Sequence, residues 1–224
     1  LRLTKNLTPS SGLEMAQELL AEAARRLAAG ELVAYPTETV FGIAALPGHA
    51  EGMCRLLDLK ERSLTAGVPL IAAEASEIEK WIEDASAQAR TGRLELQEKF
   101  WPGALSIVFS TNARAKQELM EGVFGPDGTL AARVSSCDLA RDLARTCGGL
   151  ITATSANPKG RAPAETAAKV RAYFPEMFIC CAAGAAQGRE PAQIPSTLID
   201  VRSVPFKILR EGAVARNLLA PWLG

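Results

Sequence analysis

Apolar positions along the chain follow two spacings, and their alternation predicts an α/β protein. The first helical pattern begins at Leu13, repeats its apolar residues every three or four positions through Leu27, and stops at Gly30. A short apolar run from Glu31 to Tyr35 then predicts a strand that ends at Pro36. The same two patterns predict helices over about residues 50–60, 76–82, 86–100, 138–147 and 163–174, and strands over 68–73, 105–109, 130–134, 150–154, 179–181, 195–201 and 206–210.

Local signals bear on two of these helices. Ser76 and Glu79 have the spacing of a capping box, which predicts the start of the 76–82 helix. Gly92 predicts an interruption or a weak point in the 86–100 helix.

No linker rich in Gly and Pro divides these elements, so we predict one mixed α/β domain. Residues 1–12 are polar and hold Pro, Ser and Gly, and we expect a flexible N-terminal arm there. Residues 111–128 lack periodicity and are expected to form a surface excursion. Whether that segment closes over a binding site stays open.

Charge and cysteine content narrow the classes of function. Lys plus Arg and Asp plus Glu both number 25, so unspecific attraction to nucleic acid is unsupported, although a local basic patch could still contact RNA. Five cysteines without a C-x-x-C pair, beside a single histidine, predict reduced thiols and no zinc site. No apolar run approaches the length of a membrane span and no leader pattern opens the chain. We therefore expect a cytoplasmic protein that does not contact a membrane.

Two polar clusters stand between apolar segments and share one spacing. Lys60 and Arg62 would point away from each other on a continuous helix, so they can reach one target only if the helix ends near Lys60. Ser155 and Asn157 follow a predicted strand, and in an extended chain their side chains share a face. Together the clusters could hold a phosphate, whereas each one alone is also consistent with a solvated loop.

Three further sites carry polar residues next to apolar ones. The triplet Thr37-Glu38-Thr39 follows a buried strand, which is consistent with a ligand-binding loop or with a threonine-rich turn. Arg133 lies in an apolar strand and needs an anion, so it is either a structural ion-pair member or a carboxylate clamp. His49 is expected to be a surface or capping residue rather than a catalytic base.

Missing motifs limit the chemistry. The chain has neither a P-loop nor a dinucleotide fingerprint, so isolated cations and hydroxyls would have to hold any nucleotide. No nucleophile with an adjacent base is recognisable. Nucleotidyl or phosphoryl transfer, which depends on positioning and charge stabilisation, fits these residues better.

Several ordered motifs resemble the YrdC-like family. The run from Ala34 to Gly42 is similar to the opening signature of that family, and Lys60-x-Arg62 with Ser155-x-Asn157 resembles its K-x-R…S-x-N set. Further similar segments are Trp101-Pro102-Gly103, Ala132-Arg133-Val134, Pro195-Ser196-Thr197 and Ile208-Leu209-Arg210. The resemblance covers about residues 13–214 and is greatest to the short, single-domain TsaC-type branch. It implies a catalytic domain over 13–214, followed by a C-terminal tail over 215–224.

The resemblance implies a twisted mixed parallel and antiparallel sheet, surrounding helices and a large central cavity. It also implies synthesis of L-threonylcarbamoyl-AMP from L-threonine, bicarbonate or CO2, and ATP with Mg²⁺, with release of pyrophosphate. The product would pass to a tRNA threonylcarbamoyl transferase complex, and direct contact with tRNA is left open. Lys60 and Arg62 would be catalytic, and the ATP-binding set would be Lys60, Arg62, Ser155, Asn157 and Arg210. The L-threonine-binding set would be Thr37, Thr39, Arg133 and Ser196, and no protein side chain would bind the metal.

Two positions depart from the family pattern, and two other functions stay open. Ser63 stands where a proline often follows K-x-R, and Ala73 stands where longer members carry a histidine. One alternative is an RNA-binding module for tRNA or ribosome maturation without ATP chemistry. The other is a carbamoyl-adenylate domain of hydrogenase maturation, although such domains usually belong to larger chains with zinc-finger cysteines.

Overall fold

The structure, a computed structural model, describes residues 12–181 and 194–224. Its helices are α1 Gly12–Ala28, α2 Ala50–Leu59, α3 Ser76–Glu79, α4 Ala87–Phe100, α5 Ala113–Glu118, α6 Asp138–Thr146, α7 Ala167–Tyr173 and α8 Arg216–Leu219. Short 3-10 turns are η1 Glu121–Val123, η2 Pro126–Gly128 and η4 Ala220–Trp222. The strands are β1 Val33–Tyr35, β2 Gly42–Ala44, β3 Leu70–Ala72, β4 Ile82–Glu83, β5 Leu105–Thr111, β6 Thr129–Val134, β7 Leu150–Thr152, β8 Thr154–Ser155, β9 Phe178–Ile179, β10 Thr197–Asp200 and β11 Lys207–Arg210.

Two sheets form the centre of the molecule. The smaller sheet has the order β8-β2-β1-β9, and the larger has the order β11-β10-β5-β6-β3-β7, with β4 also paired to β5. Both contain parallel and antiparallel neighbours, since β1 runs parallel to β9 and antiparallel to β2, and β5 runs parallel to β10 and antiparallel to β6. The predicted mixed sheet with surrounding helices is therefore confirmed.

The two sheets meet where β7 leads into β8. Only Ala153 separates these strands, so the chain passes directly from the larger sheet to the smaller one. Thr152 fixes the junction, because its N–H donates to the Ala45 oxygen at 3.1 Å and its Oγ1 accepts from the Ala45 N–H at 2.8 Å. Residues on the facing ends of the two sheets are thereby held together.

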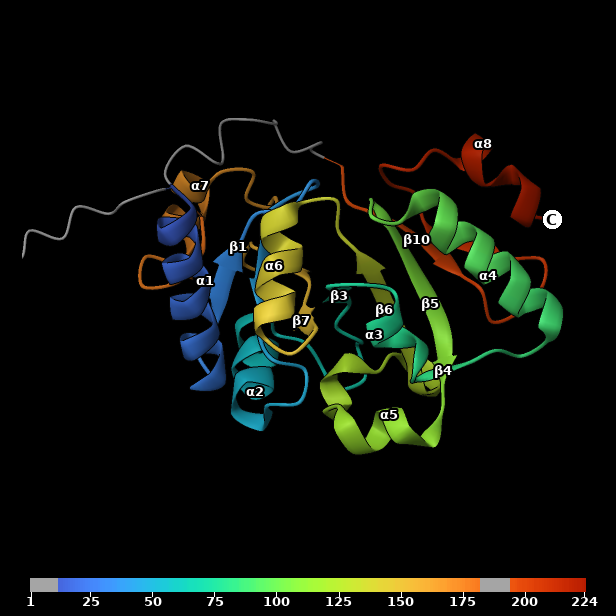
Figure 1. Cartoon of the computed structure of the whole chain (residues 1–224), viewed down its shortest axis with the longest axis horizontal. Coiled ribbons are helices and arrows are strands. Elements are labelled where there is room, and N and C mark those ends of the chain that lie inside the picture. Colours follow the sequence, from blue (N-terminus) through green and yellow to red (C-terminus); the bar gives the residue numbers. More distant parts are fainter. Residues whose placement is uncertain (1–11, 182–193) are drawn as a thin grey trace, which may run out of the picture.

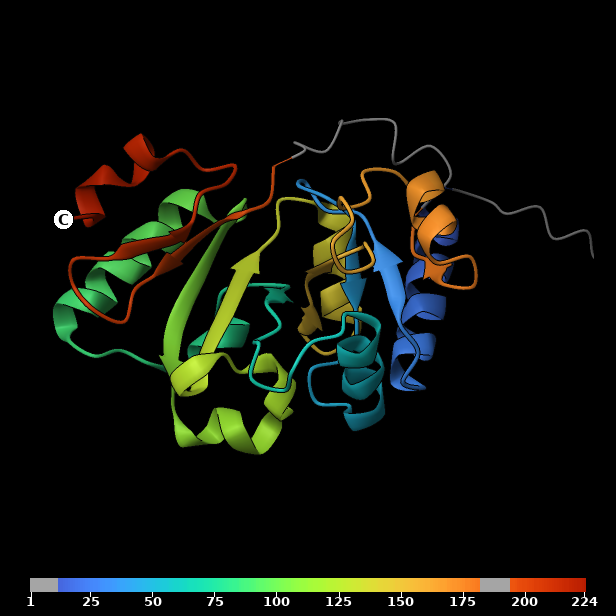
Figure 2. The same ribbon diagram turned by 180° about the vertical axis from the view of Figure 1, so that it is seen from behind.

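Helices cover the sheets in separate groups. Figure 1 shows α1 and α6 side by side over the smaller sheet and its junction with the larger one, and α4 over the β5 and β10 end. From behind, β10 and β11 lie in front of α4 (Figure 2). The residues of α8 and η4 pack on α4, where the Trp222 Nε1 donates to Glu95 at 2.9 Å. None of the described helices combines the length and apolar character that crossing a bilayer requires.

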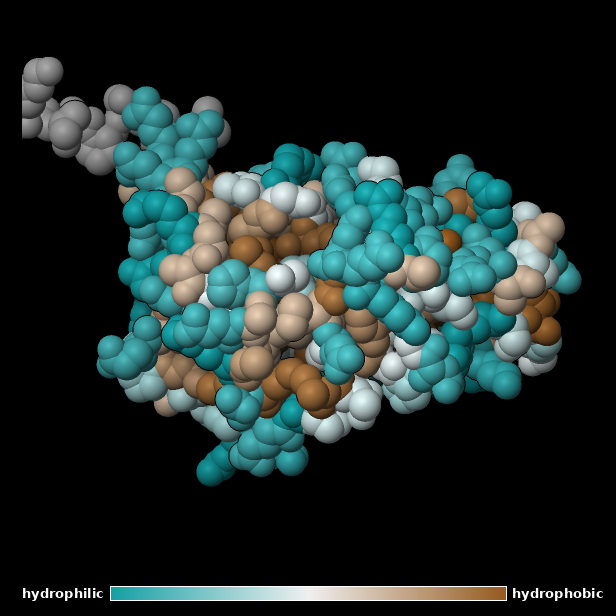
Figure 3. Space-filling model, turned by 90° about the horizontal axis from the view of Figure 1, so that it is seen from below, coloured by the Kyte–Doolittle hydropathy of each residue, from teal (hydrophilic) through white to brown (hydrophobic). Residues whose placement is uncertain are grey.

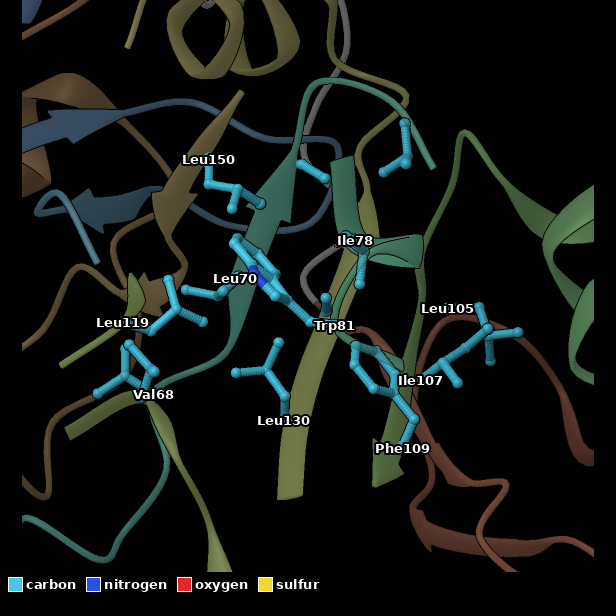
Figure 4. Packing of buried hydrophobic residues seen from close by; sticks show 14 of the residues in the cluster. Val68, Leu70, Ile78, Trp81, Leu105, Ile107, Phe109, Leu119, Leu130 and Leu150 are labelled. Carbon is cyan, nitrogen blue, oxygen red and sulfur yellow. The ribbon is translucent and has the colours of Figure 1, made fainter. Parts of the chain in front are cut away.

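The core consists of two groups of buried apolar side chains. One lies around the larger sheet and α3, where Leu70, Ile78, Trp81, Ile107 and Leu130 turn toward one another (Figure 4). The other joins α1 and α6 to β1, β3 and β7, and includes Leu27, Tyr35, Ile71, Leu143 and Ile151. Complete burial of one such side chain contributes about 1.5–3 kcal/mol. On the face seen from below, hydrophilic residues surround a hydrophobic area near the middle (Figure 3).

Several element boundaries differ from the predictions. Helix α3 ends at Glu79, and Ile82 and Glu83 instead pair with β5 as strand β4, so the 76–82 helix is wrong in its second half. Ser76 lies inside the first turn and Ala75 caps it without a side-chain hydrogen bond, so the capping box does not form. Strand β2 was not predicted, because its three residues are too few to show a period.

Two predicted irregular segments are more regular in the structure. Helix α4 runs without interruption through Gly92, where an added Cβ would lie 2.9 Å from the Phe206 ring, so close packing explains this glycine. Residues 111–128 are not a surface excursion, because they form α5, η1 and η2 and bury Ala115 and Val123 in the core. Gly12 begins α1, and the rest of the predicted arm over 1–12 lies outside the described residues. The division into arm, domain and tail stays a prediction.

Candidate functional site

A polar pocket lies between the facing ends of the two sheets. It is lined by the segment between β1 and β2 and by β8 on one side, and by β5, β6, β10 and β11 on the other. Seven of the nine predicted site residues line it: Thr37, Thr39, Arg62, Arg133, Ser155, Ser196 and Arg210. Lys60 and Asn157 are the two that do not. No Asp or Glu is among the described residues that line this pocket, so its charged side chains are all cations.

The helix that precedes Lys60 and Arg62 ends where the sequence predicts. Helix α2 stops at Leu59, Lys60 is its C-cap, and Glu61 takes a left-handed conformation with a φ of 46°. This turn separates the neighbouring side chains. Arg62 lines the pocket, whereas the Lys60 ammonium reaches behind the pocket wall to the 155–157 segment.

Lys60 uses its ammonium group to hold that segment. Its Nζ donates to the Ser155 oxygen at 2.9 Å, to the Asn157 backbone oxygen at 2.5 Å and to the Asn157 Oδ1 at 3.2 Å. The residue is 6% exposed. Burial, with a smaller effect of the Arg62 charge, lowers the pKa of Lys60 to about 8. Lys60 therefore acts on the wall of the pocket in this structure.

Ser155 and Asn157 share a face, as their spacing predicts. The Ser155 hydroxyl donates to the Asn157 Oδ1 at 2.6 Å, and the Asn157 amide donates to the Pro158 and Arg161 oxygens at 3.0 and 2.7 Å. Asn157 thus closes a turn over residues 157–161. Ser155 remains at the pocket surface beside Gly42, its partner in the sheet.

Arg210 and Ser196 form the opposite wall. The Arg210 guanidinium donates from Nε and Nη2 to the Ser196 backbone oxygen at 3.2 and 2.8 Å, and Nη2 also lies 3.2 Å from the Ser196 Oγ. Burial and the charges of Arg133 and Arg62 lower the pKa of Arg210. Arg62, Arg133 and Arg210 therefore lie around the same pocket. Such a concentration of positive charge favours an anionic ligand.

The guanidinium of Arg133 is paired with a carboxylate of the protein itself. Its Nη1 forms an ion pair with Glu38, and its Nη2 lies 3.5 Å from the Thr39 Oγ1. The structural ion pair that the sequence offered as one alternative is therefore present. Arg133 is also among the residues that line the pocket.

The segment between β1 and β2 combines both interpretations of the threonine triplet. The Thr37 Oγ1 donates to the Val40 oxygen at 2.6 Å and accepts from the Thr39 and Val40 N–H groups at 3.1 and 3.2 Å, so it closes a turn. Both Thr37 and Thr39 also line the pocket. His49 caps α2, since its Nδ1 accepts from the Gly52 N–H at 3.2 Å, and this prediction is confirmed.

Sequence reasoning missed several residues of the pocket and its surroundings. Ser106 is buried on β5 and its hydroxyl shares a hydrogen bond of 2.9 Å with the Ser196 hydroxyl. Tyr35 is fully buried and donates to the Thr152 oxygen at 2.8 Å. A serine or tyrosine within an apolar strand gives no distinctive signal. Only its distant partners reveal its place.

No cluster of three or more His, Cys, Asp or Glu side chains within the described ranges could hold a metal ion.

Comparisons with known proteins agree over most of the chain. The family model described as "Telomere recombination", for Sua5, YciO and YrdC proteins, matches residues 25–212. A threonylcarbamoyl-AMP synthase of Halorhodospira halophila is 36% identical over 195 residues, which cover 87% of this chain and 92% of that relative. The threonylcarbamoyl-AMP synthase of Chromohalobacter salexigens is 36% identical over 184 residues, covering 82% and 93% of the two chains.

Solved structures share the fold. A structure of a P. abyssi Sua5 variant superposes with a TM-score of 0.79 at 25% identity and covers 92% of this chain and 56% of that one. P. abyssi Sua5 complexed with L-threonine gives 0.77 at 24% identity, with 93% and 58% covered. E. coli YciO gives 0.69 at 17% identity and covers 89% and 91%. The chain thus spans a little more than half of Sua5 and nearly all of YciO.

Proposed function

The chain belongs to the Sua5/YciO/YrdC family, and on that premise we propose that it is a threonylcarbamoyl-AMP synthase. The family resemblance of its motifs is thereby confirmed. In the proposed reaction, L-threonine, CO2 or bicarbonate, and ATP give L-threonylcarbamoyl-AMP and pyrophosphate. One observation carries the proposal: Arg62, Arg133 and Arg210 line one pocket, and no carboxylate is among the described residues that line it. A triphosphate and an amino-acid carboxylate need such a site.

The ATP end of the site would lie at Arg62, Ser155 and Arg210. The guanidinium of Arg62 matches the oxygens of a phosphate, and the Ser155 hydroxyl adds a directional hydrogen bond. Lys60 and Asn157 would support this end from behind, because their mutual hydrogen bonds hold the segment that presents Ser155. ATP would enter as its Mg²⁺ complex.

The L-threonine end would lie at Arg133, with Thr37, Thr39 and Ser196. Arg133 is the candidate for the substrate carboxylate, because its guanidinium is buried and reaches the pocket. The hydroxyls of Thr39 and Ser196 are placed to bind polar groups of the amino acid. Ser106 supports Ser196 through the hydrogen bond between their hydroxyls.

The reaction would proceed in two steps. The neutral amine of threonine adds to CO2, forms the new N–C bond and releases a proton, which gives a carbamate. A carbamate oxygen then attacks the α-phosphorus of ATP while the bond to the bridging oxygen of the β-phosphate breaks and pyrophosphate leaves. Arg62 would stabilise the charge that moves onto the leaving phosphates, and the Lys60 cation would add to this effect from behind the pocket wall.

The product would serve tRNA modification in the cytoplasm. A mixed anhydride of this kind is reactive toward water, so its direct transfer to a tRNA threonylcarbamoyl transferase complex would limit hydrolysis. Such a hand-over would not require that this chain itself contact tRNA.

Pyrophosphate release tests the function. The complete mixture contains the protein, Mg·ATP, L-threonine and bicarbonate, and each component is left out in turn. We expect release only in the complete mixture, with the adenylate product visible by mass spectrometry. Release that ignores threonine would contradict the proposal. RNA binding that is steeply salt-dependent, without any ATP turnover, would instead favour the RNA-binding alternative.

A further inference from the structure

Glu38 lies beside the candidate threonine site without lining its pocket. Its neighbours Thr37 and Thr39 line the pocket, and so does Arg133, but Glu38 does not. It forms an ion pair with the Arg133 Nη1. Neither composition nor motif assigns it a role.

Each carboxylate oxygen of Glu38 has its own partner. Oε1 pairs with the Arg133 Nη1, and Oε2 accepts a hydrogen bond from the Ser135 hydroxyl. Ser135 is fully buried, and its Oγ accepts from the Cys137 N–H at 3.2 Å, next to the start of α6. A chain of contacts therefore runs from the start of α6 through Ser135 and Glu38 to the guanidinium.

The two terminal nitrogens of the Arg133 guanidinium have different partners. Glu38 occupies Nη1, which also lies 3.5 Å from the Gly103 oxygen. Within the described part of the chain, the one polar partner of Nη2 is the Thr39 Oγ1, at the long distance of 3.5 Å. Nη2 is thus left for a ligand on the pocket side, where Thr39 lies.

The ion pair also makes the burial of Arg133 tolerable before any substrate binds. The side chain of Arg133 is 6% exposed and that of Glu38 is 13% exposed. A guanidinium this buried is costly without a counter-charge, and it would otherwise turn toward solvent or another anion. A carboxylate that binds one edge of a planar guanidinium also fixes the direction of its other edge.

From these contacts we infer that Glu38 is the positioning residue for substrate recognition by Arg133. It holds Nη1 from outside the pocket, so that Nη2 faces the carboxylate of the amino-acid substrate. This inference rests on the proposed function, because it takes the carboxylate of L-threonine as the ligand of Arg133. Ser135 contributes to the same positioning, because its hydroxyl donates a hydrogen bond to the other carboxylate oxygen of Glu38.

Steady-state kinetics of pyrophosphate release separate positioning from simple structural support. Glu38→Ala should raise the KM for L-threonine by about 10- to 100-fold, the effect of losing one hydrogen bond to a charged group, and leave the KM for ATP nearly unchanged. Glu38→Gln keeps an oxygen for Nη1, so its KM for threonine should stay much closer to that of the wild type. Ser135→Ala keeps the ion pair between Glu38 and Arg133 but removes the hydrogen bond that holds the other oxygen of Glu38. Its KM for threonine should lie between those of Glu38→Gln and Glu38→Ala.

An analogue without the carboxylate provides a second measurement, the preference for L-threonine over L-threoninamide. A loss of folded protein alone does not change this preference. The wild type should strongly prefer L-threonine to L-threoninamide, and Glu38→Ala should narrow that preference because the guanidinium no longer faces the carboxylate. If Glu38→Ala is poorly folded, Ser135→Ala and Glu38→Gln provide the same comparison.

Two results would overturn the inference. One is an unchanged KM for threonine in Glu38→Ala. The other is a loss of activity that follows the folded fraction, with the same KM values and the same preference over the amide. The wild type separates this inference from the function itself: no threonine-dependent release by the wild type refutes both, whereas normal wild-type release with an unaffected Glu38→Ala refutes only the role of Glu38.

Discussion

Lys60 donates two hydrogen bonds to Asn157, one to its backbone oxygen at 2.5 Å and one to its side-chain oxygen at 3.2 Å. Asn157 also accepts from the Ser155 hydroxyl, so the two halves of the K-x-R…S-x-N set are joined by direct contacts across almost one hundred residues. Within this set, Arg62 reaches the pocket and Lys60 holds its wall. The two cations should therefore differ in what they contribute.

Replacement of Lys60 should destabilise the protein. In Lys60→Met the ammonium is lost. The Asn157 backbone oxygen then loses the Lys60 donor at 2.5 Å, while the Ser155 oxygen keeps the Asn157 N–H and the Asn157 Oδ1 keeps the Ser155 hydroxyl. We therefore expect the free energy of unfolding to fall by about 1–3 kcal/mol. Urea unfolding at pH 7 measures it. Lys159→Met is the matched control, because Lys159 is an exposed lysine next to the same segment and should change stability by less than about 0.5 kcal/mol. Equal stability of the two variants would contradict the anchoring role.

Replacement of Arg62 should affect turnover and leave the fold intact. Arg62 is exposed at the pocket, and within the described residues its side chain forms one hydrogen bond, to the Gly67 oxygen at the long distance of 3.5 Å. We expect Arg62→Ala to unfold like the wild type and to lose about 10²–10³ in the rate of pyrophosphate release, the usual effect of removing one charge-stabilising group. Arg161→Ala is the control, because this exposed arginine does not line the pocket and should keep nearly full turnover. Near-normal turnover in Arg62→Ala would count heavily against the assignment of the ATP end.

The sequence was informative where a local rule decides the structure. The end of α2 at Leu59 and the shared face of Ser155 and Asn157 follow from spacing alone. The cap formed by His49 follows from its position before a helix. An arginine in an apolar strand has few structural uses. The sequence therefore predicted correctly that Arg133 needs an anion.

Contacts between distant residues could not be predicted in this way. Glu38 and Arg133 are 95 positions apart, and nothing local indicates that they pair. Lys60 was expected to face the ligand, because the sequence does not reveal that Glu61 turns the chain through a left-handed conformation. Strand β4 exists because β5 offers an edge for pairing, and two residues cannot show a period of their own. Tertiary contacts thus decided what propensity left open.

The lowered pKa of Lys60 predicts that ATP binding depends on pH. Burial places this pKa at about 8 rather than its usual 10.5, so the side chain is cationic below pH 8 and becomes neutral as the pH rises through that value. The affinity for Mg·ATP should therefore decrease between about pH 7.5 and 9.5, by at most tenfold per pH unit. Isothermal titration calorimetry without threonine isolates this step from the ionisation of the substrate amine. Lys60→Met, which carries no charge at any pH, should remove most of the decrease, and an unchanged profile in that variant would assign the dependence to another group.

The ion pair between Glu38 and Arg133 should appear as a coupling energy in a double-mutant cycle. Arg133→Met leaves the Glu38 carboxylate without its cation, and Glu38→Gln leaves the guanidinium without its counter-charge. Removal of one partner of a buried pair is strongly destabilising, and since Glu38 is slightly exposed we expect a loss of about 2–4 kcal/mol for Arg133→Met. The double variant Glu38→Gln/Arg133→Met leaves no unpaired charge, so it should be more stable than the sum of the single effects by about 1–3 kcal/mol. Urea unfolding of the four proteins measures this difference. Additive single effects would mean that the two side chains do not stabilise each other, and Glu38 could then not hold Arg133 in place.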